Sequence, residues 1–253
     1  MKNLTLAQFG VTTVLATVAA IPTLAQAQNV PGNVTVNVSN GDLVIRGDSG
    51  DNNIILIESG IAGRAGTTVN GERRIFIPDG VTNNVRIEMV GGNDFVRVEL
   101  PGTNFAIPNN LVITMGLGND NLELLQTRAP NATRIDTGDG NDIIFVDGVR
   151  SFSDYVRPDF GGKFVLRTGP GKDLFEFHNA IFRGEVDVRL GDGIDGACST
   201  EDSKFLTPDL ANFDGGGPTD FPGDGFVTQI ISIPNPTNFE FFPDDCSFLG
   251  GRF

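Results

Sequence analysis

Six aspartates recur at the ends of glycine-rich turns, and their carboxylates are the side chains of this chain best placed for chemistry. The six are Asp94, Asp120, Asp142, Asp173, Asp195 and Asp220. Each closes a turn of the pattern Gly-x-Gly-x-Asp or a degenerate copy of it, as in the run Gly116-Leu117-Gly118-Asn119-Asp120. Carboxylate oxygens are the ligands that hard cations such as Ca²⁺ prefer. The turns therefore predict calcium binding, with these six residues as metal ligands.

A repeat along the chain must position these aspartates. The shortest interval between successive turns is 22 residues and occurs twice, between Asp120 and Asp142 and between Asp173 and Asp195. The longer intervals contain extra loop residues, and a further degenerate turn comes first, at residues 50–53. A repeat of this length is typical of solenoid proteins, in which each unit stacks on the next.

The segments on both sides of each turn alternate apolar and polar residues. Those before the turns are residues 85–89, 111–115, 133–137, 164–168 and 186–190, and those after are 96–100, 122–124, 144–146 and 175–177. This period of two predicts half-buried strands, which can bury their apolar face only by stacking. We predict an all-β fold, a parallel β-solenoid of the right-handed β-helix or β-roll kind with about seven coils. A β-sandwich of hairpins is the alternative.

Stacked coils would place the six aspartates in one column along an edge of the solenoid. Two unit charges about 5 Å apart repel by ~1 kcal/mol in water and by more in a drier site, so the column needs neutralising. Either Ca²⁺ lies between the turns, or each carboxylate accepts backbone N–H bonds from its own turn. Additional acids such as Asp139 and Asp192 favour the cation, whereas Lys172 within one turn favours the structural role.

Residues 116–122 and 138–144, with Gly-x-Gly-Asn-Asp followed by an apolar residue, resemble the RTX or haemolysin-type calcium-binding repeat of secreted bacterial proteins. The resemblance implies Ca²⁺ held between the turns of a parallel β-roll, with Asp120 and Asp142 as the best-matching ligands. This chain departs from the family in period, since its units have at least 22 residues. It also replaces the leading glycine of the family motif, at Met115, Thr137, Thr168 and Leu190.

The N-terminal end of the chain predicts secretion, and the C-terminal end predicts a cap on the solenoid. Residues 1–27 combine Lys2, an apolar run and a small-x-small site at residues 25–27, which is the pattern of a secretory signal peptide. No later run of about 18 apolar residues predicts a membrane span. The predicted solenoid covers residues 28–221. The Pro-, Asp- and Phe-rich tail, residues 222–253, predicts a cap over the last coil, with a sorting or partner-binding tail as the alternative.

The cysteine pair fits the same location. In an exported chain, Cys198 and Cys246 predict a disulfide, which would pin the tail to the last coils. Metal binding by these two cysteines alone is the weaker alternative. We therefore expect a protein that is secreted, extracellular or at the cell surface.

The net charge and the outward-facing residues limit the classes of function that the chain can have. A formal net charge of −14 argues against nucleic acid as a partner, and it fits either cation uptake or simple solubility. Outward-facing Glu88, Arg134, Asp136 and Arg167 would suit a polysaccharide lyase or hydrolase, but a solvated, charge-alternating face explains them as well. We predict a calcium-associated structural or adhesive protein, not an enzyme, that contacts cell-surface or matrix components. A lyase or hydrolase of the parallel β-helix type is the alternative.

Overall fold

The computed structural model describes most of the predicted solenoid. The described residues are 28–30, 34–57, 66–69, 73–76, 81–100, 106–148, 156–200, 203–217, 225–228 and 237. The predicted signal peptide, residues 1–27, lies outside them, and so does most of the predicted cap. Within the described ranges, no helix has the length and apolar character needed to cross a membrane.

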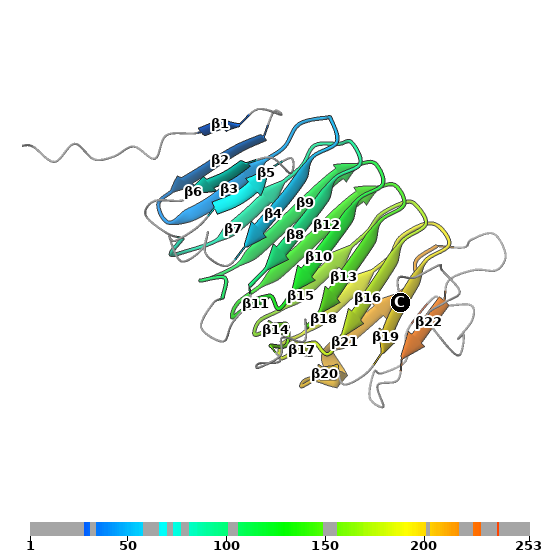
Figure 1. Cartoon of the computed structure of the whole chain (residues 1–253). Helices are drawn as coiled ribbons and strands as arrows, with labels where there is room; N and C mark the ends of the chain where they lie inside the picture. Colours follow the sequence, from blue (N-terminus) through cyan, green and yellow to red (C-terminus); the bar gives the residue numbers. More distant parts are fainter. Residues whose placement is uncertain are drawn as a thin grey trace, which may run out of the picture.

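Three sheets run along the molecule, with the chain advancing from one end to the other (Figure 1). Sheet A contains, in spatial order, β1 (Gln28–Val30), β2 (Val34–Ser39), β3 (Asp42–Arg46), β7 (Val85–Glu88), β9 (Leu111–Leu117), β12 (Thr133–Asp139), β15 (Phe164–Arg167), β18 (Val186–Arg189) and β21 (Ala211–Asp214). Sheet B contains β22 (Gly225–Thr228), β19 (Gly196–Thr200), β16 (Leu174–His178), β13 (Ile143–Asp147), β10 (Asn121–Leu125), β8 (Phe95–Glu99), β4 (Asn53–Ile57), β5 (Gly66–Val69) and β6 (Arg73–Phe76). Sheet C contains β11 (Arg128–Ala129), β14 (Asp159–Phe160), β17 (Ile181–Phe182) and β20 (Lys204–Phe205). A 3₁₀ helix, η2 (Pro208–Leu210), follows β20.

The strands alternate between sheets as the chain winds. Each coil places one strand in sheet A and the next in sheet B, and later coils add a two-residue strand in sheet C. From β3 onward, neighbours in sheet A pair in parallel, as do those in sheet B from β4 to β22 and all those in sheet C. An all-β chain with three parallel sheets of this kind is a β-solenoid, and the predicted strands before and after the turns are confirmed.

Antiparallel strands cover the N-terminal end. β2 and β3 form a hairpin, and Asn40 and Gly41 at its tip have φ angles of 52° and 82°. Positive φ at both central residues is the requirement of a type I′ turn, which an Asn-Gly pair satisfies. In sheet B, β5 and β6 pair antiparallel beyond β4. These antiparallel strands pair the edges of the first coil.

The core lies between the sheets and consists of columns of like residues. One column contains Ile87, Ile113, Ile135, Leu166 and Val188, all 0% exposed. A second contains Val96, Leu122, Ile144 and Phe175, also 0% exposed. Toward the C-terminal coils, phenylalanines fill the interior, and the rings of Phe175 and Phe177 stack with centroids 4.9 Å apart. The predicted interior stacks are confirmed.

Glycine columns let adjacent turns touch. Gly140 has a φ of +141°, and a Cβ added to it would overlap the carbonyl oxygen of Gly118 in the coil before. Gly171 and Gly193 continue this column, each against the carbonyl of the preceding member. At Gly140, only glycine satisfies both the positive φ and the close backbone approach.

The structure describes only one of the two cysteines that were predicted to form a disulfide. Cys198 lies in β19 and is 0% exposed. Cys246 lies outside the described residues, so the disulfide stays a prediction.

Candidate functional site

Five of the six predicted aspartates form one column along the solenoid. Each stands immediately before a strand of sheet B: these are Asp94, Asp120, Asp142, Asp173 and Asp195. The parallel register of sheet B brings them together. Asp220 lies outside the described residues.

Each carboxylate in the column caps a backbone amide of the neighbouring coil. Oδ1 of Asp120 accepts a hydrogen bond from the N–H of Asp94 at 2.7 Å, and Oδ1 of Asp142 accepts one from the N–H of Asp120 at 2.9 Å. Asp173 and Asp195 continue the pattern, each at 2.8 Å. The donor is therefore the N–H of the preceding coil, whereas the structural alternative considered from the sequence placed it in the aspartate's own turn. The column joins successive coils along the solenoid axis.

The aspartates of the predicted column point into the solenoid and are buried. Their exposed fractions are 2% for Asp94 and Asp120, 1% for Asp142 and 0% for Asp173. Strand alternation explains this burial, because Asp120 stands two residues before the interior residue Leu122 and so shares its face. A buried carboxylate is costly unless it is hydrogen-bonded or neutral.

The second carboxylate oxygen of these residues lacks a donor. Oδ2 of Asp94, Asp120, Asp142 and Asp173 is buried with no hydrogen-bond partner. The hydroxyl of Thr168 lies beside Asp173, but it donates its hydrogen to the carbonyl oxygen of Leu190. A hydroxyl has a single hydrogen, so Thr168 can then only accept from Asp173. A proton on the carboxyl of Asp173 would turn this contact into a hydrogen bond with the hydroxyl of Thr168 as its acceptor.

Burial sets the protonation of the column. Loss of hydration raises the pKa of Asp120 and that of Asp173 to about 7, and backbone hydrogen bonds oppose this only in part. The same cause raises the pKa of Asp94 and of Asp142, and neighbouring carboxylates add to it. Protons therefore neutralise part of the column at neutral pH.

We predict that the free energy of unfolding falls as the pH rises from about 4 to about 7. The folded state holds protons on Asp120 and Asp173 up to a pKa of about 7, whereas the unfolded chain releases them near 3.8. The folded state thus binds more protons than the unfolded chain between pH 4 and pH 7. The free energy of unfolding is therefore highest near pH 4, falls up to pH 7 and changes little at higher pH. Urea unfolding at a series of pH values checks this.

Asp187 affects the free energy of unfolding in a different pH range from the aspartate column. Burial alone would raise the pKa of Asp187, but hydrogen bonds from Asn212 and Arg189 hold it below 3.8. Its stabilising effect is lost only as the pH falls below 3.8. Stability that rises between pH 4 and 7 would contradict the assignment of protons to the column.

The donor set of the column does not fit a calcium ion. Ca²⁺ takes about six to eight oxygen ligands, commonly from several carboxylates and carbonyls. Here Oδ1 of each aspartate already faces a peptide N–H, and each coil contributes one carboxylate to the column. Among the described residues, no group of three or more His, Cys, Asp or Glu side chains could hold a metal ion.

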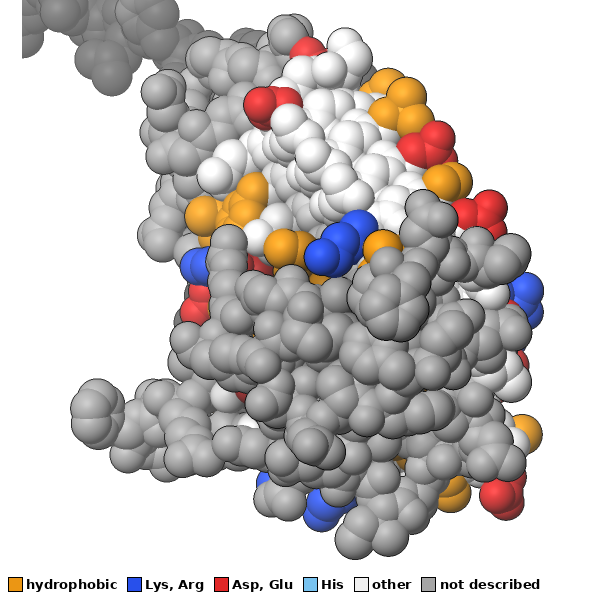
Figure 2. Space-filling model, turned by 90° about the vertical axis from the view of Figure 1, so that its right-hand side faces the viewer, with side chains coloured by type: hydrophobic (Ala, Val, Ile, Leu, Met, Phe, Trp, Pro, Cys, Tyr) orange, Lys and Arg blue, Asp and Glu red, His pale blue; other side chains and the backbone are white. Residues whose placement is uncertain are grey.

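Amide ladders at the corners are the residues that the sequence reasoning missed. At the glycine turns, Oδ1 of Asn93 accepts from the N–H of Asn119, and Oδ1 of Asn119 from that of Asn141, both at 2.8 Å. These ladder residues are exposed. Figure 2 shows one face of the molecule, where backbone and uncharged polar side chains make a broad white surface in its upper part.

A second ladder stands where the chain enters sheet A. Oδ1 of Asp42 accepts from the N–H of Asn84 at 3.0 Å, and Oδ1 of Asn84 from that of Asn110 at 3.2 Å. The signal in the sequence was the Asn-Asn pair at residues 83–84, repeated 26 residues later like the aspartates. In the buried column, the first position belongs to Asn52, not to Asn53, because the N–H of Asn52 donates to Asp94.

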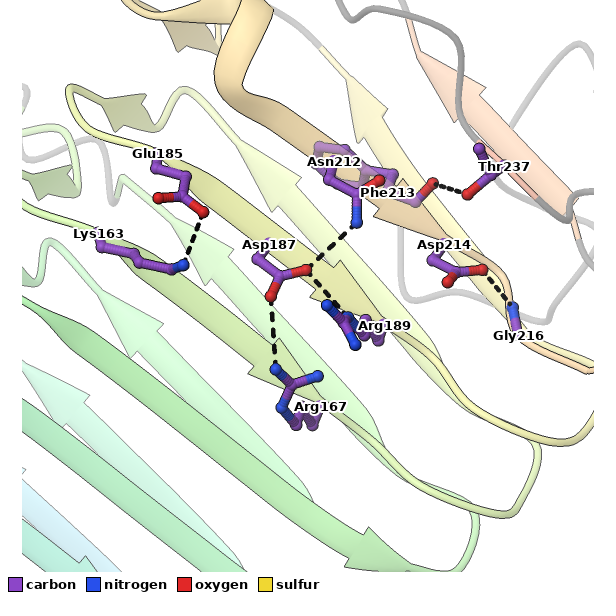
Figure 3. Close-up of polar contacts among 10 residues, drawn as sticks. All are labelled: Lys163, Arg167, Glu185, Asp187, Arg189, Asn212, Phe213, Asp214, Gly216 and Thr237. Carbon is purple, nitrogen blue, oxygen red and sulfur yellow. Dashed lines mark hydrogen bonds and ion pairs between the residues drawn. The ribbon is translucent and has the colours of Figure 1, made fainter.

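The residues considered for a lyase or hydrolase project outward from sheet A. Arg134 lies 4.0 Å from Asp136, and Glu88 accepts from Arg46 at 2.7 Å. Arg167 instead contacts Asp187 at 3.4 Å, and Asp187 lies between Arg167 and Arg189 (Figure 3). The structure therefore distributes these residues over several ion pairs along an exposed sheet.

Comparison with family models, curated proteins and solved structures returned no match for the chain. The resemblance to the RTX repeat thus rests on the turn motif alone. The geometry places the chain among β-solenoids with aspartate and asparagine ladders and identifies no family.

Proposed function

We propose that this is a secreted, non-catalytic β-solenoid with a structural or adhesive role at the cell surface or in the extracellular matrix. One observation carries the proposal: the polar groups at the turns are used to join coils. The buried aspartates and the corner asparagines each bind a backbone amide of an adjacent coil. Such side chains reinforce the long axis of the molecule and do not converge on a substrate.

The finer architecture belongs to the same proposal. We infer a right-handed coil from the general preference of parallel crossover connections. Seven strands in each of sheets A and B succeed one another by parallel pairing, which supports about seven coils. The tail, residues 222–253, would cap the last coil, with the disulfide between Cys198 and Cys246 holding it there.

Calcium is not required for the proposed role. Hydrogen bonds and protons account for the buried column without a cation. The lyase or hydrolase alternative has no supporting observation among the described residues, because Arg134, Asp136 and Arg167 face solvent from a regular sheet and contact one another or Asp187.

Fractionation of the source cells tests the proposal. We expect the protein in the surface or medium fraction, with Gln28 as its first residue by mass spectrometry, and we expect cells that lack it to attach or assemble matrix less well. Adding back the folded protein should restore attachment, whereas heat-unfolded protein should not. Retention inside the cell with residues 1–27 attached would contradict export. Release of new sugar ends from a polysaccharide panel would contradict the non-catalytic role.

A further inference from the structure

The outer face of sheet A differs in charge from the rest of this acidic molecule. Ahead of the glycine turns, five arginines and five carboxylates project from its strands, a formal charge of zero, while the whole chain carries −14. The arginines are Arg46, Arg86, Arg134, Arg167 and Arg189, and the acids are Asp42, Glu88, Asp136, Asp187 and Asp214. An anionic partner would meet less repulsion on this face than the net charge of the whole chain implies.

The arginines in the two halves of the face differ in how many hydrogen bonds they make to neighbouring carboxylates. In the C-terminal half, Asp187 accepts hydrogen bonds from Arg167 at 3.4 Å, Arg189 at 3.1 Å and Asn212 at 3.2 Å. Figure 3 shows this closed network, with Lys163 and Glu185 paired beside it. These guanidiniums are already engaged with a carboxylate.

In the N-terminal half, two guanidiniums are held only loosely. Arg86 lies 3.6 Å from Glu88, which already accepts from Arg46 at 2.7 Å. Arg134 lies 4.0 Å from Asp136. Neither guanidinium makes a hydrogen bond within the described part of the chain, and 46% of the Arg86 side chain and 58% of the Arg134 side chain are exposed.

Arg86 and Arg134 also share one column. The parallel register aligns Arg86 with Val112 and Val112 with Arg134, so the two arginines stand two coils apart. Coils are about 4.8 Å apart, which separates the two Cα positions by roughly 10 Å along the axis. Val112, partly exposed, provides an apolar step between the two charges.

We propose that Arg86 and Arg134 bind the carboxylates of a linear uronate-bearing polysaccharide that lies along sheet A, parallel to the solenoid axis. A guanidinium matches a carboxylate with two parallel N–H donors. The rings of an extended sugar chain recur at close to the spacing of one coil, so carboxylates two sugars apart meet the two arginines, and the intervening ring packs on Val112. A nucleic acid is a poorer partner, because its dense phosphate charge is repelled by the net charge of the chain.

This inference rests on the proposed adhesive role and names its ligand class. The test is calorimetric binding of polygalacturonate to the purified full chain, with neutral dextran as the comparison polymer. The variant is R86Q/R134Q, and the matched control is K172Q/K204Q, which removes two exposed positive charges elsewhere. We expect R86Q/R134Q to weaken binding by about tenfold or more, because charge-assisted hydrogen bonds are lost, and the control to stay within about twofold.

The outcomes separate this inference from the proposed function. Equal weakening by both double variants, no weakening by R86Q/R134Q, or dextran bound as tightly as polygalacturonate would each overturn the inference. Attachment to cells or matrix without binding to polygalacturonate would overturn the inference alone, while failure of both would remove the adhesive role as well. Both arginine substitutions should leave the melting temperature unchanged, because neither guanidinium makes a hydrogen bond within the described part of the chain. A loss of binding would then not be caused by a loss of folding.

Discussion

Replacing Gly140 with alanine is expected to lower the free energy of unfolding by about 4 kcal/mol or more, the upper end for a single substitution. The new Cβ would overlap the carbonyl oxygen of Gly118, and the φ of +141° is one that alanine rarely adopts. The obstructing atom is backbone of the preceding coil, so no side chain can move aside. Relief requires the coils to separate, which breaks the hydrogen bonds on both sides of the turn. For a chain of this length, the melting temperature should fall by roughly 10 °C.

The matched control is Gly50→Ala in the first turn. Gly50 has no left-handed φ, and the nearest atom to an added Cβ is the Asp48 carboxylate oxygen at 3.5 Å. We expect a change of at most about 0.5 kcal/mol. If circular dichroism melts show Gly140→Ala and Gly50→Ala to be equally mild, the close contact between turns is not a determinant of the fold.

Removing one buried carboxylate should lower the free energy of unfolding by less than Gly140→Ala does. The dependence of this effect on the replacing residue and on pH is more informative. Asp120→Ala leaves the N–H of Asp94 buried without an acceptor, which is worth about 1–3 kcal/mol. Asp120→Asn keeps an oxygen at the same position and is expected to be at least as stable as the wild type at pH 8, where the native carboxyl loses its proton. Urea unfolding of both variants at pH 5 and pH 8 measures the difference.

The chain already contains a precedent for the amide. Asn52 occupies the first position of the column and donates its side-chain amide to the carbonyl of Gly50. The amide introduced by Asp120→Asn is expected to use the carbonyl of Gly118 in the same way, two residues earlier. If Asp120→Asn is as destabilising as Asp120→Ala at both pH values, then the carboxylate does more than accept a hydrogen bond and carry a proton.

The strands and stacking were predictable because the repeat carries two strong signals. Alternation marks interior residues such as Ile113 and Ile135, and the 22-residue interval aligns them. The inward direction of the aspartates was also available, since Asp120 and Leu122 share a strand face. The prediction of one column along an edge left the burial of the carboxylates open, because acidic residues in turns are usually solvated, whereas here glycine lets adjacent coils approach and cover them.

Other features were beyond the sequence for physical reasons. The strands of sheet C have two residues each, as in Arg128–Ala129, which is too short to show a period. An Asn-Asn pair taken alone is equally typical of an isolated turn, so only its repeat 26 residues later, at residues 109–110, indicates a corner ladder. The ion pairs depend on side-chain length as well as register: Arg167 contacts Asp187 on the adjacent strand, although residue 167 aligns with residue 189.

The most direct test of the aspartate column is unfolding of the wild type and of Asp120→Asn/Asp173→Asn at pH 4 to 8, with EGTA and with millimolar Ca²⁺. The structure predicts that wild-type stability falls with pH, that the double variant shows a smaller slope, and that Ca²⁺ shifts neither curve. A ligand that binds only the folded state must raise its stability. A melting temperature that rises with Ca²⁺ in the wild type, and does not in the double variant, would show that the column is a metal site and contradict this account.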